Sequence, residues 1–197
     1  MKKQLLLILI TSCILMVACN SKKNEEATLK IYEPKTAEAE VEMSPIKRGE
    51  LLVNAVGCHD CHSPKKMTDK GPILDPDRLL SGHPANEALS PYDMQTAKSY
   101  ILFSPGLTGT VGPWGTSFAA NLTPDDTGMG GWTEAQFLIA IKQGKYKGME
   151  NSRSLLPPMP WQSFSHFPDE DLKAIFAYLQ TIKPVSNLVP PPIPPKA

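Results

Sequence analysis

Three stretches of the chain carry apolar residues at helical spacing, and each begins with a capping signal. Ser44-Pro45 places a hydroxyl before a proline and opens the first helix. Thr133-Glu134-Ala135-Gln136 is a capping box and opens the second, which is expected to end near Gly144. Asp169-Glu170-Asp171 puts acidic charge on the first turn of the third, which should stop at Lys183-Pro184. The apolar positions are Ile46, Leu52, Val53 and Val56, then Phe137, Leu138 and Ile141, then Leu172, Ile175, Phe176, Leu179 and Ile182.

The N-terminus has the pattern of an export signal. Lysines precede an apolar run from Leu5 to Val17, which is short for a membrane span and typical of a secretory signal. The run ends in Leu15-Met16-Val17-Ala18-Cys19, which resembles a bacterial lipobox and implies a signal of residues 1–18 and a lipid on Cys19. An ordinary signal peptide cut nearby, or an uncleaved anchor, is the alternative. Residues 19–43 are mostly charged or small, so we expect a disordered tether.

Charge and cysteine count narrow the choice of function. The 197-residue chain has 20 basic and 20 acidic residues, and the signal removes two lysines, which leaves 18 basic groups against 20 acidic ones. This balance argues against nucleic acid as a partner. Of the four cysteines, Cys13 leaves with the signal and Cys19 takes lipid. Only Cys58 and Cys61 remain in the folded part.

These two cysteines belong to Gly57-Cys58-His59-Asp60-Cys61-His62, a Cys-x-x-Cys-His motif. On one helical turn both thiols and the imidazole of His62 share a side, so the sulfurs can form thioethers to one haem and His62 can lie under its iron. The pattern is typical of c-type haem attachment. A thioredoxin-like redox motif would need a βαβ context that the sequence lacks. Half of a zinc site would need two more ligands, and only His83 and His166 are left. His83 is expected to be a surface or loop histidine rather than a ligand.

The segment after the motif resembles a class I cytochrome c. Lys70-Gly71-Pro72-Ile73-Leu74 is similar to the Gly-Pro-x-Leu segment of that family, in which the proline carbonyl accepts a hydrogen bond from the ligating histidine. The resemblance implies that Pro72 orients His62 through its Nδ1–H. A plain Gly-Pro turn is the alternative.

From Gly112 to Ile182 the chain resembles the haem-binding modules of cytochrome subunits from membrane-bound alcohol and sugar dehydrogenases. The resemblance rests on Gly112-Pro113-Trp114-Gly115, on Asn121-Leu122-Thr123-Pro124 and on Trp132. It implies that Asn121 and Trp132 lie along the haem edge near the propionates. A loop rich in glycine and proline, with a core tryptophan, is the alternative.

Leu155-Leu156-Pro157-Pro158-Met159-Pro160-Trp161 should be stiff and extended because proline fixes φ. Such a segment can present one thioether at a set distance from a metal, and a thioether opposite an imidazole favours Fe(II). The resemblance places the distal iron ligand at Met159. Alternatively, Met159 fills the core and His166 or water completes the iron.

Together the resemblances imply an all-α domain with the cytochrome c fold over residues 44–184, followed by a Pro-rich tail, residues 185–197. The first and last helices should cross, with Gly49 and Val53 against Ile175 and Tyr178. Haem-enclosing loops, with short helices starting at Asp75 and Ser90 and a possible small hairpin from Tyr100 to Val111, should lie between them.

The function implied is one-electron transfer by a single covalently bound haem c, with no catalysis of its own. The partners would be periplasmic or membrane redox proteins (a dehydrogenase, reductase or oxidase), and the lipid would anchor the protein to a membrane on its periplasmic side. Two alternatives stay open. One is an electron-transfer subunit of a membrane-bound dehydrogenase complex. The other is a haem enzyme or gas sensor with a labile distal ligand, since Arg153 and His166 lie near Met159 in the sequence.

Overall fold

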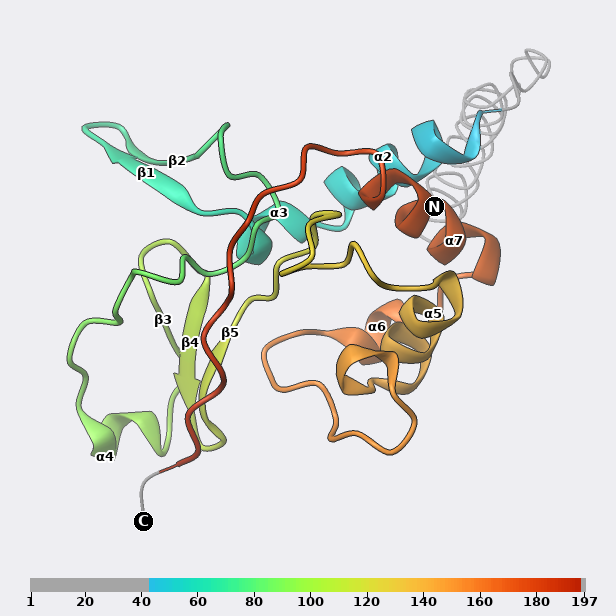
Figure 1. Ribbon diagram of the computed structural model, residues 1–197. Helices are drawn as coiled ribbons and strands as arrows, with labels where there is room; N and C mark the ends of the chain where they lie inside the picture. Colours follow the sequence, from blue (N-terminus) through green and yellow to red (C-terminus); the bar gives the residue numbers. More distant parts are fainter. Residues whose placement is uncertain (1–42, 196–197) are drawn as a thin grey trace, which may run out of the picture. The chain divides into compact units, whose positions relative to one another are not determined.

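Helices α2 (Pro45–Ala55) and α7 (Asp169–Leu179) cross where α2 carries a glycine. In the computed structural model, which describes residues 43–195, a Cβ on Gly49 would overlap the carbonyl oxygen of Ala174 and lie 2.8 Å from the Cβ of Tyr178. Only a residue without a side chain allows two helix backbones to come this close. The expected crossing of the first and last helices is confirmed (Figure 1).

Local capping chemistry sets where the helices begin. The side chain of Ser44 accepts a hydrogen bond from the N–H of Lys47, 3.4 Å away, at the start of α2. Both halves of the predicted capping box, Thr133 and Gln136, are formed at the start of α5 (Glu134–Gln143), which ends at a left-handed Gly144. These two helix starts and the α5 end therefore match the sequence prediction.

Five short strands lie between the Cys-x-x-Cys-His motif and Phe118, so the expectation of an all-α domain is not confirmed for the described residues. One sheet is an antiparallel hairpin, β1–β2, and the other is antiparallel with the order β3–β4–β5. The hairpin expected between Tyr100 and Val111 is present as β3–β4, extended by β5. Each strand has four residues or fewer, too short for an alternating pattern to stand out in the sequence. The bounds are β1 Lys65–Thr68, β2 Gly71–Leu74, β3 Leu102–Phe103, β4 Gly109–Gly112 and β5 Gly115–Phe118.

The short helices also differ from expectation. Residues 75–80 form turns rather than a helix, and the second helix, α4 (Met94–Ala97), starts at Asp93 rather than at Ser90. Asp93 caps it by accepting from the N–H of Thr96 at 2.6 Å. The remaining short elements are the 3₁₀ turn η1 (Tyr146–Gly148) and helix α6 (Trp161–Phe164).

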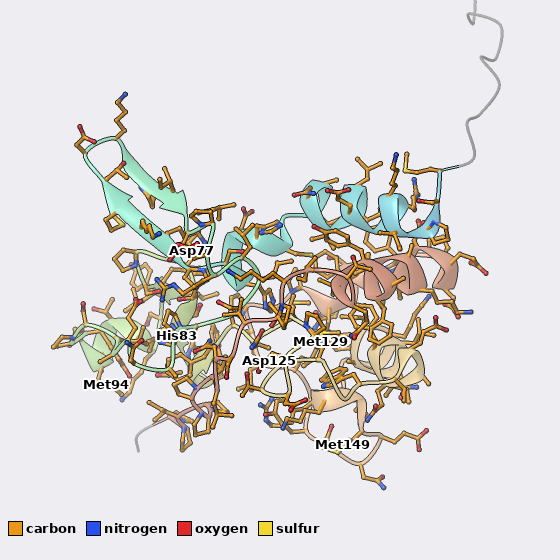
Figure 2. The ribbon with its side chains drawn as sticks, turned by 45° about the horizontal axis from the view of Figure 1, so that its top comes forward. Asp77, His83, Met94, Asp125, Met129 and Met149 are labelled. Atoms are coloured by element: carbon orange, nitrogen blue, oxygen red, sulfur yellow. The ribbon has the colours of Figure 1, made fainter. Side chains whose placement is uncertain are left out.

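The core is formed mainly by apolar side chains of α2, α5 and α7. Met129 is buried inside it, whereas Met149 is 49% exposed (Figure 2). Cys58, Trp132 and Met159 are partly buried and pack against this core. Its members are Leu52, Val53, Leu80, Met129, Phe137, Ile141, Leu172, Ile175 and Leu179, and together they are called the apolar core below.

Residues 185–195 pack against the domain and do not form a separate tail. The segment runs from the end of α7 toward β5 (Figure 1), where the N–H and carbonyl of Ile193 pair with Thr116 at 3.0 and 2.7 Å. A Cβ on Gly115 would meet the backbone of Pro194 at 2.7 Å. The compact unit thus extends past the boundary expected at residue 184.

The predicted signal, the tether and Cys19 lie outside the described residues. Among residues 43–195, no helix has the length and apolar character needed to cross a bilayer.

Candidate haem site

The two thiols lie on a single helical turn, α3 (Cys58–His62). Gly57 adopts a left-handed conformation, φ 74°, which turns the chain from α2 into α3. A Cβ there would meet Oδ2 of Asp60 at 2.6 Å. Cys58 and Cys61 are half-buried free thiols, and Cys58 contacts the apolar core.

Burial sets the protonation of the motif. It raises the pKa of the Cys58 thiol to about 11 and raises that of Cys61, so both are neutral thiols at neutral pH. Redox-active Cys-x-x-Cys pairs have lowered thiol pKa values, so this environment argues against the thioredoxin-like interpretation. Burial also lowers the pKa of His62, which favours the neutral imidazole that binds metals.

His62 is held in one tautomer by a backbone carbonyl. Its Nδ1 lies 2.8 Å from the carbonyl oxygen of Ala120. A carbonyl can only accept, so Nδ1 carries the proton and Nε2 keeps its lone pair for a metal. The acceptor is therefore the carbonyl of Ala120. The resemblance had implied the carbonyl of Pro72 instead. Pro72 lies exposed in β2, opposite Met67 in the hairpin.

Two loops converge on His62. The N–H of Gly82 donates to the carbonyl of His62 at 2.7 Å, and the N–H of His83 donates to the carbonyl of Ala119 at 2.9 Å. Gly82 has φ 78°, and a Cβ there would lie 2.6 Å from the Ala119 oxygen and 2.7 Å from the Ala120 oxygen. The loop around Gly82 therefore fixes both the backbone of His62 and the carbonyl that orients its ring.

Lys65 and Ser63, which the sequence did not mark as functional, form hydrogen bonds at the C-terminal end of α3. The ammonium of Lys65 donates to the carbonyls of His59, Asp60 and Ser63, the last at 3.0 Å. Ser63 is fully buried, and its hydroxyl accepts from the N–H of Leu80 at 2.8 Å. The Lys65 bonds satisfy carbonyls at the C-terminal end of the short helix.

Met159 packs against the apolar core at the end of its proline segment. The hydroxyl of Ser117 donates to the carbonyl of Pro157 at 2.6 Å and accepts from Nε1 of Trp114 at 3.2 Å. Trp161, on the other side of Met159, packs directly over Gly144. The segment is thus fixed on both sides of the thioether, as a metal ligand would require.

Asn121 has a different role from the one implied. It is buried, its Nδ2 donates to the carbonyl of Val185 at 2.8 Å, and its Oδ1 accepts from the N–H and hydroxyl of Thr123. Its side chain therefore bonds the C-terminal segment. Trp132 packs against the apolar core, and its place at a haem edge stays a prediction.

His83 lies in a loop, one of the two expected places, but its side chain is buried rather than on the surface. Its Nε2 lies 2.9 Å from the carbonyl of Glu87 and its Nδ1 lies 2.9 Å from the hydroxyl of Thr108. Its ring packs on Phe118, with centroids 4.6 Å apart. Both ring nitrogens are engaged, so His83 acts in packing.

The side chains weighed for an open distal site are engaged elsewhere. The guanidinium of Arg153 lies 3.9 Å from the centroid of the Tyr146 ring. His166 is exposed, and its Nδ1 lies 2.9 Å from the carbonyl of Gln162. Neither belongs to the group of side chains that packs with Met159 against the apolar core.

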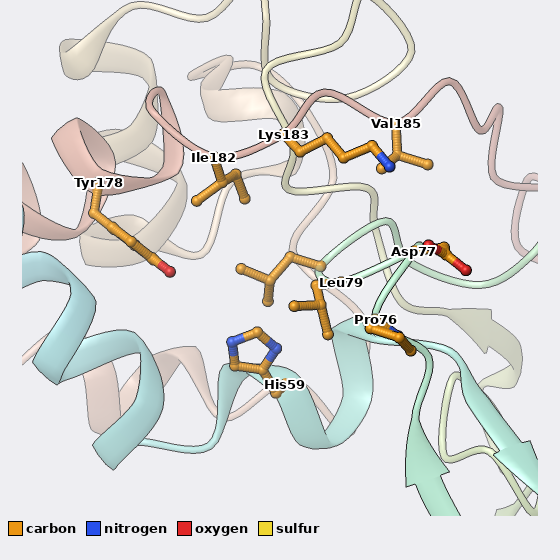
Figure 3. A pocket seen from close by; sticks show the side chains of 9 residues that line it. His59, Pro76, Asp77, Leu79, Tyr178, Ile182, Lys183 and Val185 are labelled. Carbon is orange, nitrogen blue, oxygen red and sulfur yellow. The ribbon is translucent and has the colours of Figure 1, made fainter.

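A cavity of about 90 Å³ lies beside α3 (Figure 3). His59, Tyr178 and Lys183 are among its lining residues, whereas Cys58, Cys61, His62 and Met159 are not. The cavity is therefore separate from those four side chains.

The residues present fit a covalently attached haem. Two free thiols share one turn, a neutral imidazole offers Nε2, and a thioether packs on the same apolar core as Cys58. Within residues 43–195, no group of three or more His, Cys, Asp and Glu side chains is arranged to bind a metal ion by itself.

The chain is similar in sequence to several cytochromes. No protein-family model matches it. A gluconate 2-dehydrogenase cytochrome c subunit from Pantoea cypripedii is 31% identical over 144 residues, 72% of this chain and 24% of the relative. The cytochrome c subunit of a quinone alcohol dehydrogenase from Gluconacetobacter polyoxogenes is 41% identical over 77 residues, 38% of this chain and 16% of the relative. A diheme c-type cytochrome from Cereibacter sphaeroides is 35% identical over 138 residues, 70% of this chain and 36% of the relative.

The matches thus span only about a quarter of the gluconate dehydrogenase subunit and little more than a third of the diheme cytochrome, so the likeness concerns one module. The resemblance predicted from the sequence is confirmed: the chain is similar to a c-type cytochrome module of the cytochrome c subunits of dehydrogenases.

Proposed function

We propose that this protein is a membrane-anchored cytochrome c with a single haem that carries one electron at a time between redox partners on the periplasmic side of a membrane. The observation that carries the proposal is the hydrogen bond from Nδ1 of His62 to the carbonyl of Ala120. It holds the imidazole in the tautomer that an iron ligand needs, directly after two thiols on the same turn.

Each residue of the site has one task in this proposal. Cys58 and Cys61 form thioethers, Nε2 of His62 is the proximal ligand, and Sδ of Met159 is the distal one. When bound, the haem supplies a one-electron iron couple, whose potential a His/Met pair raises. The His62 ring is held by the carbonyl of Ala120, and the proline segment that carries Met159 is held by the hydroxyl of Ser117, so the protein has little to rearrange between oxidation states.

The likeness to dehydrogenase subunits supports a dehydrogenase as one redox partner. The sequence contains one Cys-x-x-Cys-His motif, which supports one haem per chain although one relative is named as diheme. Acylation of Cys19 would anchor the chain to the membrane.

The test is to produce the full chain in a host that attaches haem and exports the protein. Intact mass should show one haem per chain, and a redox titration should follow a one-electron curve. The Cys58→Ala/Cys61→Ala variant should carry no covalent haem, while Cys13→Ser, in the predicted signal, should carry the normal amount. A wild-type chain without covalent haem, or with a two-electron thiol–disulfide couple, would contradict the proposal.

A further inference from the structure

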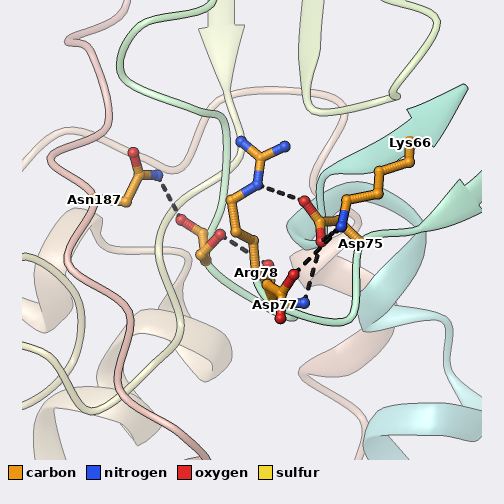
Figure 4. Close-up of polar contacts among 6 residues, drawn as sticks. Lys66, Asp75, Asp77, Arg78 and Asn187 are labelled. Carbon is orange, nitrogen blue, oxygen red and sulfur yellow. Dashed lines mark hydrogen bonds and ion pairs between the residues drawn. The ribbon is translucent and has the colours of Figure 1, made fainter.

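Asn187, in the C-terminal segment 185–195, makes more contacts than a linker residue needs. Its Nδ2 donates to the carbonyl of Ser81 at 2.7 Å, the dashed line that leaves Asn187 in Figure 4. It also donates to the carbonyl of His83 at 2.9 Å. Its Oδ1 accepts from the N–H of Ala85 at 2.9 Å. Its own N–H donates to the hydroxyl of Thr127 at 2.9 Å.

These partners fix the orientation of the amide. Carbonyls only accept, so the atom between Ser81 and His83 must be the NH₂ group. A backbone N–H only donates, so the atom facing Ala85 must be the oxygen. The side chain thus clamps residues 81–85 into one turn.

Gly82, at the centre of that turn, contacts His62 directly. It donates to the His62 carbonyl at 2.7 Å and packs against the Ala119–Ala120 backbone, which accepts the His62 Nδ1–H. Asn187 holds the carbonyls on either side of Gly82.

The same C-terminal segment also holds the second loop. The carbonyl of Val185 accepts from Nδ2 of Asn121, the residue after Ala120, at 2.8 Å. The N–H of Val185 donates to the hydroxyl of Thr123 at 3.1 Å. Both loops that reach His62 are therefore tied to residues 185–187.

We infer that Asn187 is a positioning residue for the axial histidine. Its side chain bonds Ser81, His83 and Ala85 rather than His62, and it acts by keeping Gly82 against the carbonyl that accepts the His62 Nδ1–H. The inference rests on the proposed function, because it matters only if His62 binds iron. A shorter Nδ1–H···O=C bond makes an imidazole a more basic ligand, which favours ferric iron. Loosening the turn should therefore raise the reduction potential.

The test compares Asn187→Ala with wild type, both as the full haem-loaded protein. NMR of the reduced form measures the solvent exchange of the His62 Nδ1 proton, and a redox titration measures the potential. The loss of three side-chain hydrogen bonds to residues 81–85 should accelerate that exchange by about tenfold or more. The potential should move to a more positive value.

Two controls separate positioning from general destabilisation. Asn86→Ala removes the same side chain at an exposed position next to the clamped turn and should leave both readouts unchanged. Thr133→Ala removes the α5 cap and should lower the urea midpoint of unfolding, without the shift in potential. If Asn187→Ala does not accumulate with haem, Asn187→Ser, which keeps one donor, should give a smaller change in the same direction.

Unchanged proton exchange and potential in the haem-loaded Asn187 variant, with His62 still on the iron, would overturn the inference and leave the proposed function standing. A change equal to that of Thr133→Ala would also overturn it. Absence of covalent haem in the wild-type chain would instead remove the proposed function itself.

Discussion

Nδ1 of His62 lies 2.8 Å from the carbonyl oxygen of Ala120, 58 residues further along the chain. A side chain directly after the half-buried thiol of Cys61 is thus oriented by the loop that follows β5. The bond leaves the lone pair of Nε2 free, which is the histidine tautomer that iron binding needs.

Gly82→Ala should disturb this arrangement. The new Cβ would press on the Ala119 and Ala120 oxygens at 2.6 and 2.7 Å. Besides left-handed strain of about 1–3 kcal/mol, overpacking should cost about 1–3 kcal/mol, measured by urea unfolding of the haem-loaded protein. Gly71→Ala is the matched control, because Gly71 also has positive φ but no atom within 4 Å of an added Cβ. Equal losses in the two variants would contradict the predicted contact.

Gly49→Ala should push the first and last helices apart. The added methyl would overlap the carbonyl oxygen of Ala174, a backbone atom that cannot turn away. We expect a loss of about 3 kcal/mol in the free energy of unfolding, the upper end of the usual overpacking cost. Gly131→Ala, where a Cβ meets nothing within 4 Å, should change stability by no more than about 0.5 kcal/mol. Unaltered stability of Gly49→Ala would mean that the helices do not cross at this residue.

Asp75 should make stability depend on pH in the acid range. Its hydrogen bonds to Lys66, at 2.9 Å, and Arg78, at 2.7 Å, lower the pKa of the carboxyl from 3.8 to about 2 (Figure 4). A carboxyl whose pKa is depressed by folding stabilises the folded state above its unfolded pKa. That stabilisation is lost as the pH falls from about 4 through about 2.

The measurement is the urea midpoint across this range for wild type and Asp75→Asn. The variant should be less stable near neutral pH, and the gap should shrink as the pH falls. Asp126→Asn changes an exposed carboxylate in the same way and should follow the wild-type profile. A gap that stays constant with pH would show that Asp75 is not the group responsible.

Cys19→Ser should release the protein from the membrane. The lipobox resemblance predicts a lipid on Cys19, and without it the hydrophobic attachment is lost. Fractionation should find the wild type with membranes and the variant in the soluble periplasmic fraction. Cys13→Ser, within the predicted signal, is the control and should stay with the membrane. Membrane retention of Cys19→Ser would point to the uncleaved anchor instead.

The parts of the fold that follow from local chemistry could be predicted from the sequence. Ser44 and Thr133 cap the helices that they were expected to cap, because an N-cap depends on a few neighbouring residues. Gly49 marks the helix crossing because the pattern of the first helix places it on the packed side.

The parts that depend on backbone groups distant in sequence could not be predicted. A carbonyl such as that of Ala120 leaves no residue-type signal, so the Gly-Pro segment at Pro72 was the more visible candidate. Asn121 bonds Val185, 64 residues away, and nothing local distinguishes this from a contact with a haem. Prolines after residue 189 indicated a stiff tail without naming its partner, and Ile193 pairs with Thr116 of β5.

The most direct test of the account is the optical spectrum of the oxidised, haem-loaded protein. The weak far-red band of methionine bound to ferric iron should be present in wild type and absent in Met159→Ala. Met149→Ala, which removes a thioether that is 49% exposed, should keep the band. This result would support ligation by His62 and Met159 and a dedicated electron carrier. A wild-type protein with a high-spin spectrum that readily binds carbon monoxide or cyanide would contradict it and favour a haem enzyme or sensor.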